Sequence, residues 1–326
     1  MKIYQLLLLP CFVQSFVVPK RKHVRLAHQI KHTSSLPSQT SLYKQKRMNT
    51  RTSKATKLKL LPSITELGES LFSYTGNVPF WQAFGLNAIL FALLSKKLLK
   101  SLTPEGFAHS FALGTLLWTT LGWRGWSLCV LYLVAGNLVT KVRFAEKEKR
   151  GLAEKRGGRR GPENVWGSAL TALVCASCSI QGPSFLGISS DLYVIGFVAS
   201  LATKLADTFA SEIGKAYGKT TFLITNLQRV EPGTEGAISA EGTAAAVGGG
   251  LLLALYGWAT SLISGPAVPI VTTAAFIATN IESVLGATLQ EKKGLEWVTN
   301  EIINGLNTLI GAIIAIAATM LVIGSS

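Results

Sequence analysis

The residues best suited to chemistry lie in residues 206–219, a polar stretch that directly follows an apolar one. Read as a helix, its i, i+4, i+7 and i+11 positions form one face. That face carries Asp207, Ser211, Gly214 and Gly218, and the other charged side chains are Glu212, Lys215 and Lys219. Ionisable groups at the edge of hydrocarbon are costly and by default face a polar cavity. The stretch is therefore a candidate site, and the alternative is a helix end whose charges are simply solvated.

The loop after this stretch contains a second polar motif. Residues 232–236 read Pro-Gly-Thr-Glu-Gly, a pattern typical of a turn with exposed backbone amides, which can cradle phosphate oxygens. The motif supplies Gly233, Thr234, Glu235 and Gly236. The same loop carries Arg229 before the motif and Glu241 after it, where the next apolar segment begins.

Two later apolar segments also contain polar side chains. Glu282 lies within one of them, and Asn300, Asn304 and Asn307 share one helical face at the start of the last. Carboxylates, amides, cations and a glycine turn together are typical of a Mg²⁺–polyphosphate site, because Mg²⁺ takes oxygen ligands and few of them from protein. No Walker A or protein-kinase motif set is present, and all four His lie at or before His109, which argues against a hydrolytic triad.

The elements that must position these side chains are membrane helices. The chain has 326 residues, of which 48% are hydrophobic and only 15% charged, and its mean hydropathy is +0.36. Soluble domains carry about 25% charged residues. Repeated apolar runs of about 20 residues predict an all-α fold, a polytopic transmembrane helical bundle of about 7–8 spans. The candidate spans are residues 79–95, 106–122, 123–140, 165–181, 191–206, 242–263, 266–285 and 304–323.

The charge distribution orients these spans. Residues 1–65 hold 13 Lys/Arg and no acidic residue, whereas the rest of the chain holds 19 basic and 17 acidic residues. The net charge of +15 is therefore no argument for nucleic-acid binding. The loops after the first, third, fifth and seventh candidate spans are basic, and the alternate loops are nearly free of Lys and Arg. The positive-inside rule then places all the polar segments on one side of the membrane. The basic segment 141–164 is expected to be a solvated hairpin that could contact anionic lipid.

Small residues predict close helix packing around the polar stretch. Ala206, Ala210, Gly214 and Gly218 repeat every four residues, and residues 248–250 are all glycine. Such positions let neighbouring helices approach closely. Cys175 and Cys178 form a CxxC within an apolar helix and without a second Cys pair, so we interpret them as packing residues rather than a metal or redox site.

The N-terminal region has the composition of a targeting sequence. Residues 1–19 resemble a signal peptide, and residues 20–65 form a basic, transit-peptide-like segment that is expected to be disordered. The junction near Phe16 resembles the two-part leaders of algae with secondary plastids. We expect residues 66–326 to form an integral membrane kinase-like domain in the plastid inner envelope, with the site facing the stroma. Alternatives are an endomembrane location through an ordinary secretory signal, and a mitochondrial presequence.

Four blocks of this sequence resemble the plant-type phytyl-phosphate kinase family, part of a broad family of multi-span membrane proteins of largely unknown function. The blocks are residues 206–218, 229–239 and 282–290, and Asn304 with Asn307. Residues 207–218 and 241–242 also show a fainter likeness to dolichol and phytol kinases and CTP-using lipid transferases. In the family an Asp is frequent where this chain has Glu282.

The resemblance implies phosphoryl transfer from a nucleoside triphosphate, with CTP the expected donor, to phytyl phosphate. The product, phytyl diphosphate, would feed tocopherol and phylloquinone synthesis and phytol salvage. Asp207 and Glu282 are then expected to hold Mg²⁺, with Glu212, Glu235 and Glu241 as lesser candidates. Lys215, Lys219 and Arg229 would hold phosphates, and Asn304 and Asn307 would orient water or phosphate. The prenyl tail would lie in the lipid bilayer or in a groove between helices.

Other functions stay open at this point. A transporter or lipid-handling protein could use intramembrane carboxylates to relay protons or bind an ion. A structural membrane subunit would need no site. A CTP-dependent prenol kinase or cytidylyltransferase would differ only in its acceptor. The sequence leaves the nucleotide, the prenyl chain length and the oligomeric state undetermined.

Overall fold

The computed structural model of the 326-residue chain describes residues 64–73, 76–290, 294–295 and 297–323. Residues 1–63, which hold nearly all of the predicted signal-peptide and transit-peptide segments, lie outside the described residues. The chain divides into two units, residues 1–70 and 71–326. In the first unit the structure describes only the start of helix α3 (Ile64–Leu71). The second unit holds all the other helices that the structure describes, and it is treated below.

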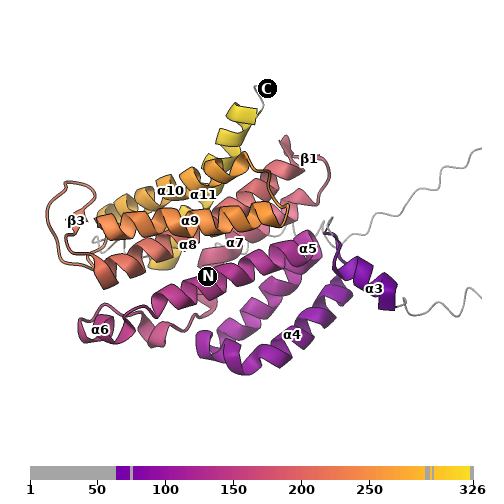
Figure 1. Cartoon of the computed structure of the whole chain (residues 1–326), viewed down its shortest axis with the longest axis horizontal. Helices are drawn as coiled ribbons and strands as arrows, with labels where there is room; N and C mark the ends of the chain where they lie inside the picture. Colours follow the sequence, from indigo (N-terminus) through magenta and orange to yellow (C-terminus); the bar gives the residue numbers. More distant parts are fainter. Residues whose placement is uncertain (1–63, 74–75, 291–293, 296, 324–326) are drawn as a thin grey trace, which may run out of the picture. The chain divides into compact units, whose positions relative to one another are not determined.

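The second unit is a bundle of long helices whose connections lie at the helix ends (Figure 1). Its long helices are α4 (Phe80–Ser101), α5 (Pro104–Thr140), α7 (Pro162–Ser179), α8 (Ser190–Tyr217), α9 (Ala240–Ala259), α10 (Ala267–Leu289) and α11 (Asn300–Ile323). The short elements are α6 (Phe144–Lys149), the 3-10 helix η1 (Lys155–Gly158), and two antiparallel hairpins, β1 (Ser184–Phe185) with β2 (Ile188–Ser189) and β3 (Phe222–Leu223) with β4 (Ala237–Ile238).

Helix α5 consists of two predicted spans joined at a sharp reversal. Gly122 has φ 64° and ψ −156°, a conformation that interrupts the helix and that glycine adopts without steric cost. In a straight helix, Gly114 and Trp126 would lie about 18 Å apart along the axis. Instead, a Cβ atom at Gly114 would be 3.1 Å from the indole nitrogen of Trp126, and the Trp118 and Trp126 rings lie 5.0 Å apart. The two halves therefore fold back on each other, as the separate spans 106–122 and 123–140 predicted.

The connections segregate to two ends of the bundle. At one end, the Arg160 backbone amide donates to the Ser101 carbonyl at 2.9 Å, and the Arg143 guanidinium donates to the Ala216 carbonyl at 3.1 Å. At the other end, Arg124 donates to the Ser261 carbonyl at 2.7 Å. At the first end, these bonds join the connections that follow the first, third and fifth predicted spans. At the other end, the bond of Arg124 joins the connections that follow the second and sixth predicted spans. In Figure 1, the labels α6 and β3 lie at the end opposite β1.

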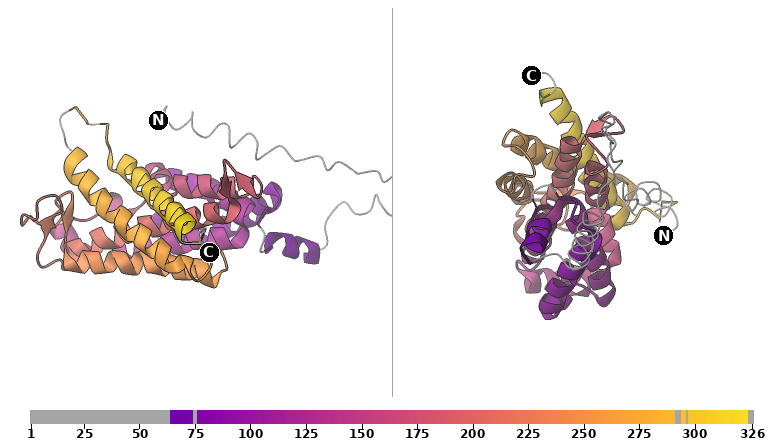
Figure 2. Two further views of the ribbon diagram at one scale, coloured as in Figure 1. Left: turned by 90° about the horizontal axis from the view of Figure 1, so that it is seen from above. Right: turned by 90° about the vertical axis from the view of Figure 1, so that its right-hand side faces the viewer.

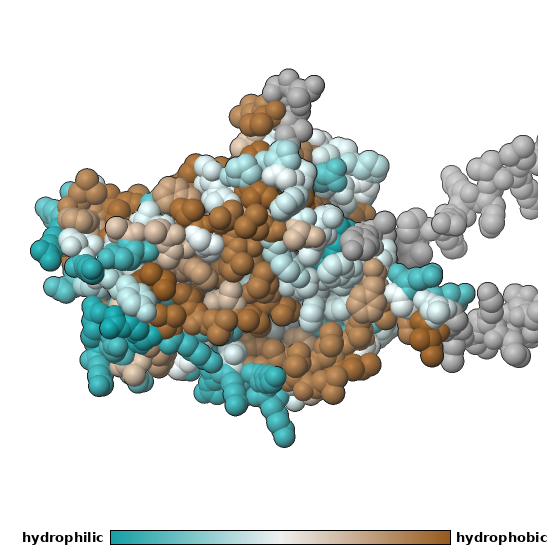
Figure 3. All heavy atoms as spheres, viewed as in Figure 1, coloured by the Kyte–Doolittle hydropathy of each residue, from teal (hydrophilic) through white to brown (hydrophobic). Residues whose placement is uncertain are grey.

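Length and composition qualify five of the described helices to cross a membrane: α4, α8, α9, α10 and α11. The other three predicted spans are the two halves of α5 and helix α7, which are helical at the predicted positions. On the face shown in Figure 3, hydrophobic side chains cover the middle of the bundle, and hydrophilic ones gather toward the end that bears α6. The predicted all-α membrane bundle is confirmed.

Helix α8 is the centre of the bundle. It packs against α7, α9, α10 and α11, and 83% of its most apolar window is buried inside the protein. The views in Figure 2 show α9, α10 and α11 packed alongside it. Helices α8 and α9 approach closely at small residues that were predicted to allow such packing, because a Cβ atom at Gly249 would lie only 3.0 Å from the Leu205 carbonyl oxygen. The serine caps Ser189 and Ser239 begin α8 and α9 by accepting hydrogen bonds from backbone amides.

Candidate functional site

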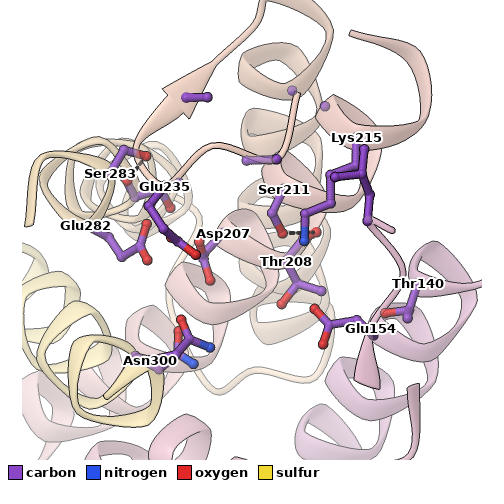
Figure 4. Close-up of a pocket in the computed structure, with 18 of the residues that line it drawn as sticks. Thr140, Glu154, Asp207, Thr208, Ser211, Lys215, Glu235, Glu282, Ser283 and Asn300 are labelled. Atoms are coloured by element: carbon purple, nitrogen blue, oxygen red, sulfur yellow. Dashed lines mark hydrogen bonds between the residues drawn. The ribbon is translucent and has the colours of Figure 1, made fainter. Parts of the chain in front are cut away.

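A cavity of about 570 Å³ opens at the end of the bundle where the basic connections meet. Helices α8, α10 and α11 form one side, and the segments 151–160 and 232–239 form much of the rest. Helices α7 and α9 also contribute, with Asn164 and Ser168 coming from α7. Figure 4 shows that the labelled side chains converge on this space from separate helices and loops. Most of the lining is polar, although the helices that carry it are apolar along most of their length.

A buried lysine joins two helices at the base of the cavity. The Lys204 ammonium group donates to Asp207 Oδ2 at 2.5 Å and to Asn304 Oδ1 at 2.7 Å. Lys204 and Asp207 lie one turn apart on α8, and Asn304 comes from α11. All three are buried, with exposed fractions of 8%, 9% and 6%. A charge in such a place is stable only when it is paired and hydrogen-bonded, so these residues fix one another's positions.

Two further carboxylates face Asp207 across the cavity. Glu282 comes from α10 and Glu235 from the loop before β4, and in Figure 4 both side chains point toward Asp207. Glu282 interacts electrostatically with Asp207, Lys204 and Glu235. Gly236 allows this approach, because its φ is +76° and any Cβ atom there would meet the Ser283 carbonyl at 2.6 Å. Asp207 and Glu282 therefore both interact with the Lys204 ammonium group, and Glu235 adds a third carboxylate beside Glu282.

The opposite side of the cavity is mainly basic. Segment 151–160 contributes Lys155, Arg156, Arg159 and Arg160 together with the acidic Glu154, and Lys215 comes from α8. Arg156 pairs with Glu163 and also donates to Asn164 Oδ1 at 3.2 Å. The cavity thus offers a cationic wall opposite an acidic group, which is an arrangement suited to a polyphosphate with its counter-cation.

The predicted solvated hairpin at residues 141–164 needs correction. Lys147, in its short helix α6, is only 1% exposed. Its ammonium group bonds Glu212 and donates to the Thr140 carbonyl at 2.8 Å. This buried ion pair anchors α6 to α8 and thereby holds segment 151–160 against the cavity. The pattern of alternating Lys and Glu gave no sign that one lysine turns inward.

The structure brings together nine of the residues predicted for the site. They are Asp207, Gly214, Lys215, Gly233, Thr234, Glu235, Gly236, Glu282 and Asn304, all in the cavity lining. Gly233 and Gly236 have positive φ angles, as the predicted glycine turn requires. The roles assigned to these residues in binding or catalysis stay predictions.

Six predicted site residues do not line the cavity: Glu212, Gly218, Lys219, Arg229, Glu241 and Asn307. Glu212 is buried against Lys147 instead, and Gly218 is the C-cap residue of α8. Asn307 is fully buried one turn below Asn304, and neither of its side-chain polar atoms has a partner within the described part of the chain. Asn304 and Asn307 thus share a helical face, and only Asn304 reaches the cavity.

Sequence reasoning missed Lys204 and the arginines of segment 151–160. A signal for Lys204 was present, because a lone lysine three residues before Asp207 in an apolar helix requires a partner. Asp207 supplies that partner on the same helix. The arginines lie far from the other site residues in sequence, so only the tertiary fold places them at the cavity.

The side chains that could ligate a metal ion in the cavity can be compared with the ligands that Mg²⁺ prefers. Among the described residues, no group of three or more acidic, His or Cys side chains is arranged to hold a metal ion. Asp207 and Glu282 face each other as a pair. Mg²⁺ commonly binds through one or two carboxylates and takes its other ligands from water and phosphate. The pair therefore fits Mg²⁺ bound together with a polyphosphate, and fits less well a metal held by protein alone.

The fold and this cavity define a multi-pass membrane protein with a polar site at one end of its helices. Residues 87–312 match the family model described as Integral membrane protein DUF92, and the chain belongs to this family. An uncharacterized membrane protein of Synechocystis, sll0875, is 52% identical over 73% of this chain and 90% of its own length.

Two further relatives extend the comparison. Protein VTE6, chloroplastic, of Arabidopsis thaliana is 43% identical over 73% of this chain and 72% of its own length. An uncharacterized membrane protein of Methanocaldococcus jannaschii, MJ0933, is 32% identical over 69% of this chain and 88% of its own length. No solved structure matches the chain significantly.

Proposed function

We propose that this protein is an integral membrane kinase that transfers a phosphoryl group from a nucleoside triphosphate to phytyl phosphate. CTP is the expected donor, and phytyl diphosphate for tocopherol and phylloquinone synthesis is the expected product. The observation that carries the proposal is the cavity, where Asp207, Glu282 and Glu235 face a wall of Lys and Arg at one end of apolar helices. The sequence blocks and the similarity to a chloroplastic plant protein support the choice of substrate.

The reaction suits these residues because it needs no general base. A phosphate monoester has a second pKa of about 6 and is largely dianionic near neutral pH. One acceptor oxygen would attack the γ-phosphorus, and the bond from that phosphorus to the β–γ bridging oxygen would break. The nucleoside diphosphate leaves with the electron pair, and no proton needs to move. The barrier is the repulsion between two anions, which positioned cations lower.

Named residues can supply those cations and hold the phosphates. Lys215, Arg156 and Arg159 would bind donor phosphates, and the backbone amides of Gly233, Glu235 and Gly236 would donate hydrogen bonds to the phosphate oxygens. Asp207 and Glu282 would hold Mg²⁺, which supplies charge neutralisation at the phosphates when it is bound. Asn304 would keep the Lys204 ammonium aimed at Asp207, so that the lysine limits the negative charge of the acidic group.

The proposed location is the plastid inner envelope, with the cavity on the stromal side. The chloroplastic name of the plant relative supports a plastid membrane. The connections at the cavity end are basic, and the positive-inside rule supports placing such connections on the stromal side of this membrane. A nucleotide of the stroma would then reach the cavity without crossing the membrane.

The test is a substrate matrix with purified protein in lipid nanodiscs. CTP, ATP, GTP and UTP are each combined with Mg²⁺ and with phytyl phosphate, geranylgeranyl phosphate or phytol. We expect phytyl diphosphate and the nucleoside diphosphate in equal amounts. Phosphorylation of phytol alone would identify a prenol kinase, and release of pyrophosphate would identify a cytidylyltransferase. Failure with every pair would contradict the proposal and favour transport.

A further inference from the structure

A second, apolar cavity adjoins the polar one. It measures about 70 Å³ and lies between α4, α5 and α7, where its lining includes Phe91, Leu113, Val130 and Ala169. Its polar lining is very small. Half-buried side chains such as Phe91 belong to its wall, so one side of the cavity lies near the outer surface of the bundle. We call this cavity the α4–α5–α7 groove.

The groove and the polar cavity share part of their walls. Arg160, Asn164 and Ser168 line both. These are a guanidinium, an amide and a hydroxyl, and all three can donate hydrogen bonds to an anion. The Asn164 oxygen already accepts from the Gly161 amide at 3.0 Å and from Arg156, which leaves the NH₂ group of that side chain available as a donor.

Arg160 is held firmly at this junction. Its backbone amide donates to the Ser101 carbonyl at 2.9 Å, and its carbonyl accepts from the Thr103 amide at 3.0 Å. Its guanidinium donates to the Tyr132 hydroxyl at 2.5 Å. Gly136 provides the space, because a Cβ atom there would be 2.7 Å from the guanidinium.

The charge of Arg160 is not neutralised by the protein. Within the described part of the chain, no carboxylate lies at salt-bridge distance from Arg160, whereas Arg143 and Arg156 both have one. A half-buried arginine that is positioned by backbone bonds and a tyrosine, and that lacks an anionic partner, has the properties of an anion-binding group.

We propose that the groove and Arg160 form the acceptor subsite for a prenyl phosphate. This inference rests on the proposed function. The phosphate monoester binds Arg160, Asn164 and Ser168, with its oxygens facing the polar cavity. The first carbons of the isoprenoid chain occupy the groove. A water-sized group needs about 10–15 Å³ of cavity volume, so 70 Å³ holds about five to seven such groups, which is enough for the five carbons of one isoprene unit. The remaining chain extends from the groove into lipid.

Photo-crosslinking tests this subsite without requiring catalysis. The probe is a phytyl phosphate analogue with a diazirine on its first isoprene unit, incubated with the full chain in nanodiscs without nucleotide. We expect labelled peptides from α5 and α7 around Leu113, Val130 and Ala169. Labelling concentrated on α9 and α10 would overturn the inference.

Paired variants separate the head-binding and chain-binding parts. Arg160→Gln should reduce labelling at least tenfold, whereas Lys149→Gln, an exposed cation outside the cavity, should not change it. Val130→Phe should block the groove. Val134→Phe is its matched control, one turn along α5, at a position that is 48% exposed and outside the lining. Equal labelling in Arg160→Gln and Lys149→Gln would contradict the phosphate contact.

Further measurements identify the ligand and distinguish a failure of this inference from a failure of the proposed function. The phytol analogue should label weakly and should not respond to Arg160→Gln, because it lacks the phosphate. Phosphatidic acid that displaced the probe as well as phytyl phosphate does would contradict an isoprenoid groove. Groove labelling without diphosphate formation in the substrate matrix would reject the kinase and keep the subsite. Diphosphate formation with labelling elsewhere would reject the subsite and keep the kinase.

Discussion

Lys204 determines the electrostatics at the base of the cavity. It is a cation within an apolar helix, and it is kept there by Asp207 and Asn304. Removing one partner from a buried ion pair costs about 3–5 kcal/mol, because the remaining charge is left uncompensated. Asp207 therefore has two tasks, one structural toward Lys204 and one proposed toward Mg²⁺, and a variant has to separate them.

Asp207→Asn provides that separation at the residue scale. The amide keeps the size of the side chain and an oxygen that can accept from Lys204, but it removes the negative charge. Glu282 also interacts electrostatically with Lys204, so the buried ammonium group keeps an anionic neighbour in this variant. We expect at least a hundredfold loss of kcat with little change in expression or in the elution profile on gel filtration. Asp191→Asn, an exposed acidic residue in the first turn of the same helix, is the control and should retain activity. Wild-type activity in Asp207→Asn would reject a role for this carboxylate in the reaction.

At the residue scale, the sequence was sufficient to predict those site residues that a single helix reveals by its own pattern. Asp207, Glu282 and Asn304 were found because each is a polar residue in an apolar helix. Glu212 was predicted together with them but lies against Lys147, which is 65 residues away, and no local pattern links the two. Arg160 was missed for the same reason, since its position depends on contacts with α4 and α5.

At the scale of elements, α6 and the residues beside it bind the C-terminal end of α8, and we call these contacts the clamp. Lys147 pairs with Glu212, Arg143 donates to the Ala216 carbonyl, and Arg150 donates to the Lys215 carbonyl at 3.2 Å. The segment that follows α6 forms the basic wall of the cavity. A change that weakens the clamp should therefore also displace the basic wall of the cavity.

A double-mutant cycle at Lys147 and Glu212 tests the clamp. Each single change, Lys147→Met or Glu212→Leu, should lower the free energy of unfolding by about 3–5 kcal/mol, because it leaves a buried charge without its partner. The double variant should be more stable than either single one. The measurement is unfolding in mixed micelles by added SDS, with Lys149→Met as an exposed control. Strictly additive losses in the double variant would show that the two residues do not interact.

The adjacent glycines of α9 provide a test of the α8–α9 contact. A Cβ atom at Gly249 would be 3.0 Å from the Leu205 carbonyl oxygen, whereas one at Gly248 would meet nothing within 4 Å. Gly249→Leu should therefore separate α8 from α9 and destabilise the protein by about 1–3 kcal/mol or more. Gly248→Leu should be neutral or slightly stabilising, since leucine is the better helix former. The same unfolding measurement distinguishes them, and equal effects would contradict the close contact.

At the scale of the whole molecule, hydropathy and charge were sufficient to predict the fold class. Eight apolar segments, their breaks and the alternation of basic loops all follow from local composition. The reversal at Gly122 was predicted only as a boundary, because its geometry depends on a single glycine φ angle. The association of segment 151–160 with α8 could not be predicted, since it rests on buried pairs between distant residues.

The segregation of connections predicts which positions share a side of the membrane. Single cysteines at Lys97 and Lys219 should react with a charged maleimide from one side of sealed vesicles. A cysteine at Leu186, which lies beyond β1 and is 81% exposed, should react only from the other side. The three native cysteines within the described part of the chain are not exposed, which keeps the background low. Labelling of all three positions from the same side would contradict the topology.

The wall shared by the polar cavity and the α4–α5–α7 groove has a consequence for kinetics. An acceptor held there keeps its chain in lipid while its head reacts, so it never enters bulk water. Turnover would then follow the mole fraction of acceptor in the membrane rather than its amount per litre. Added inert lipid would slow the enzyme at constant total substrate, and the nucleotide dependence would be unaffected.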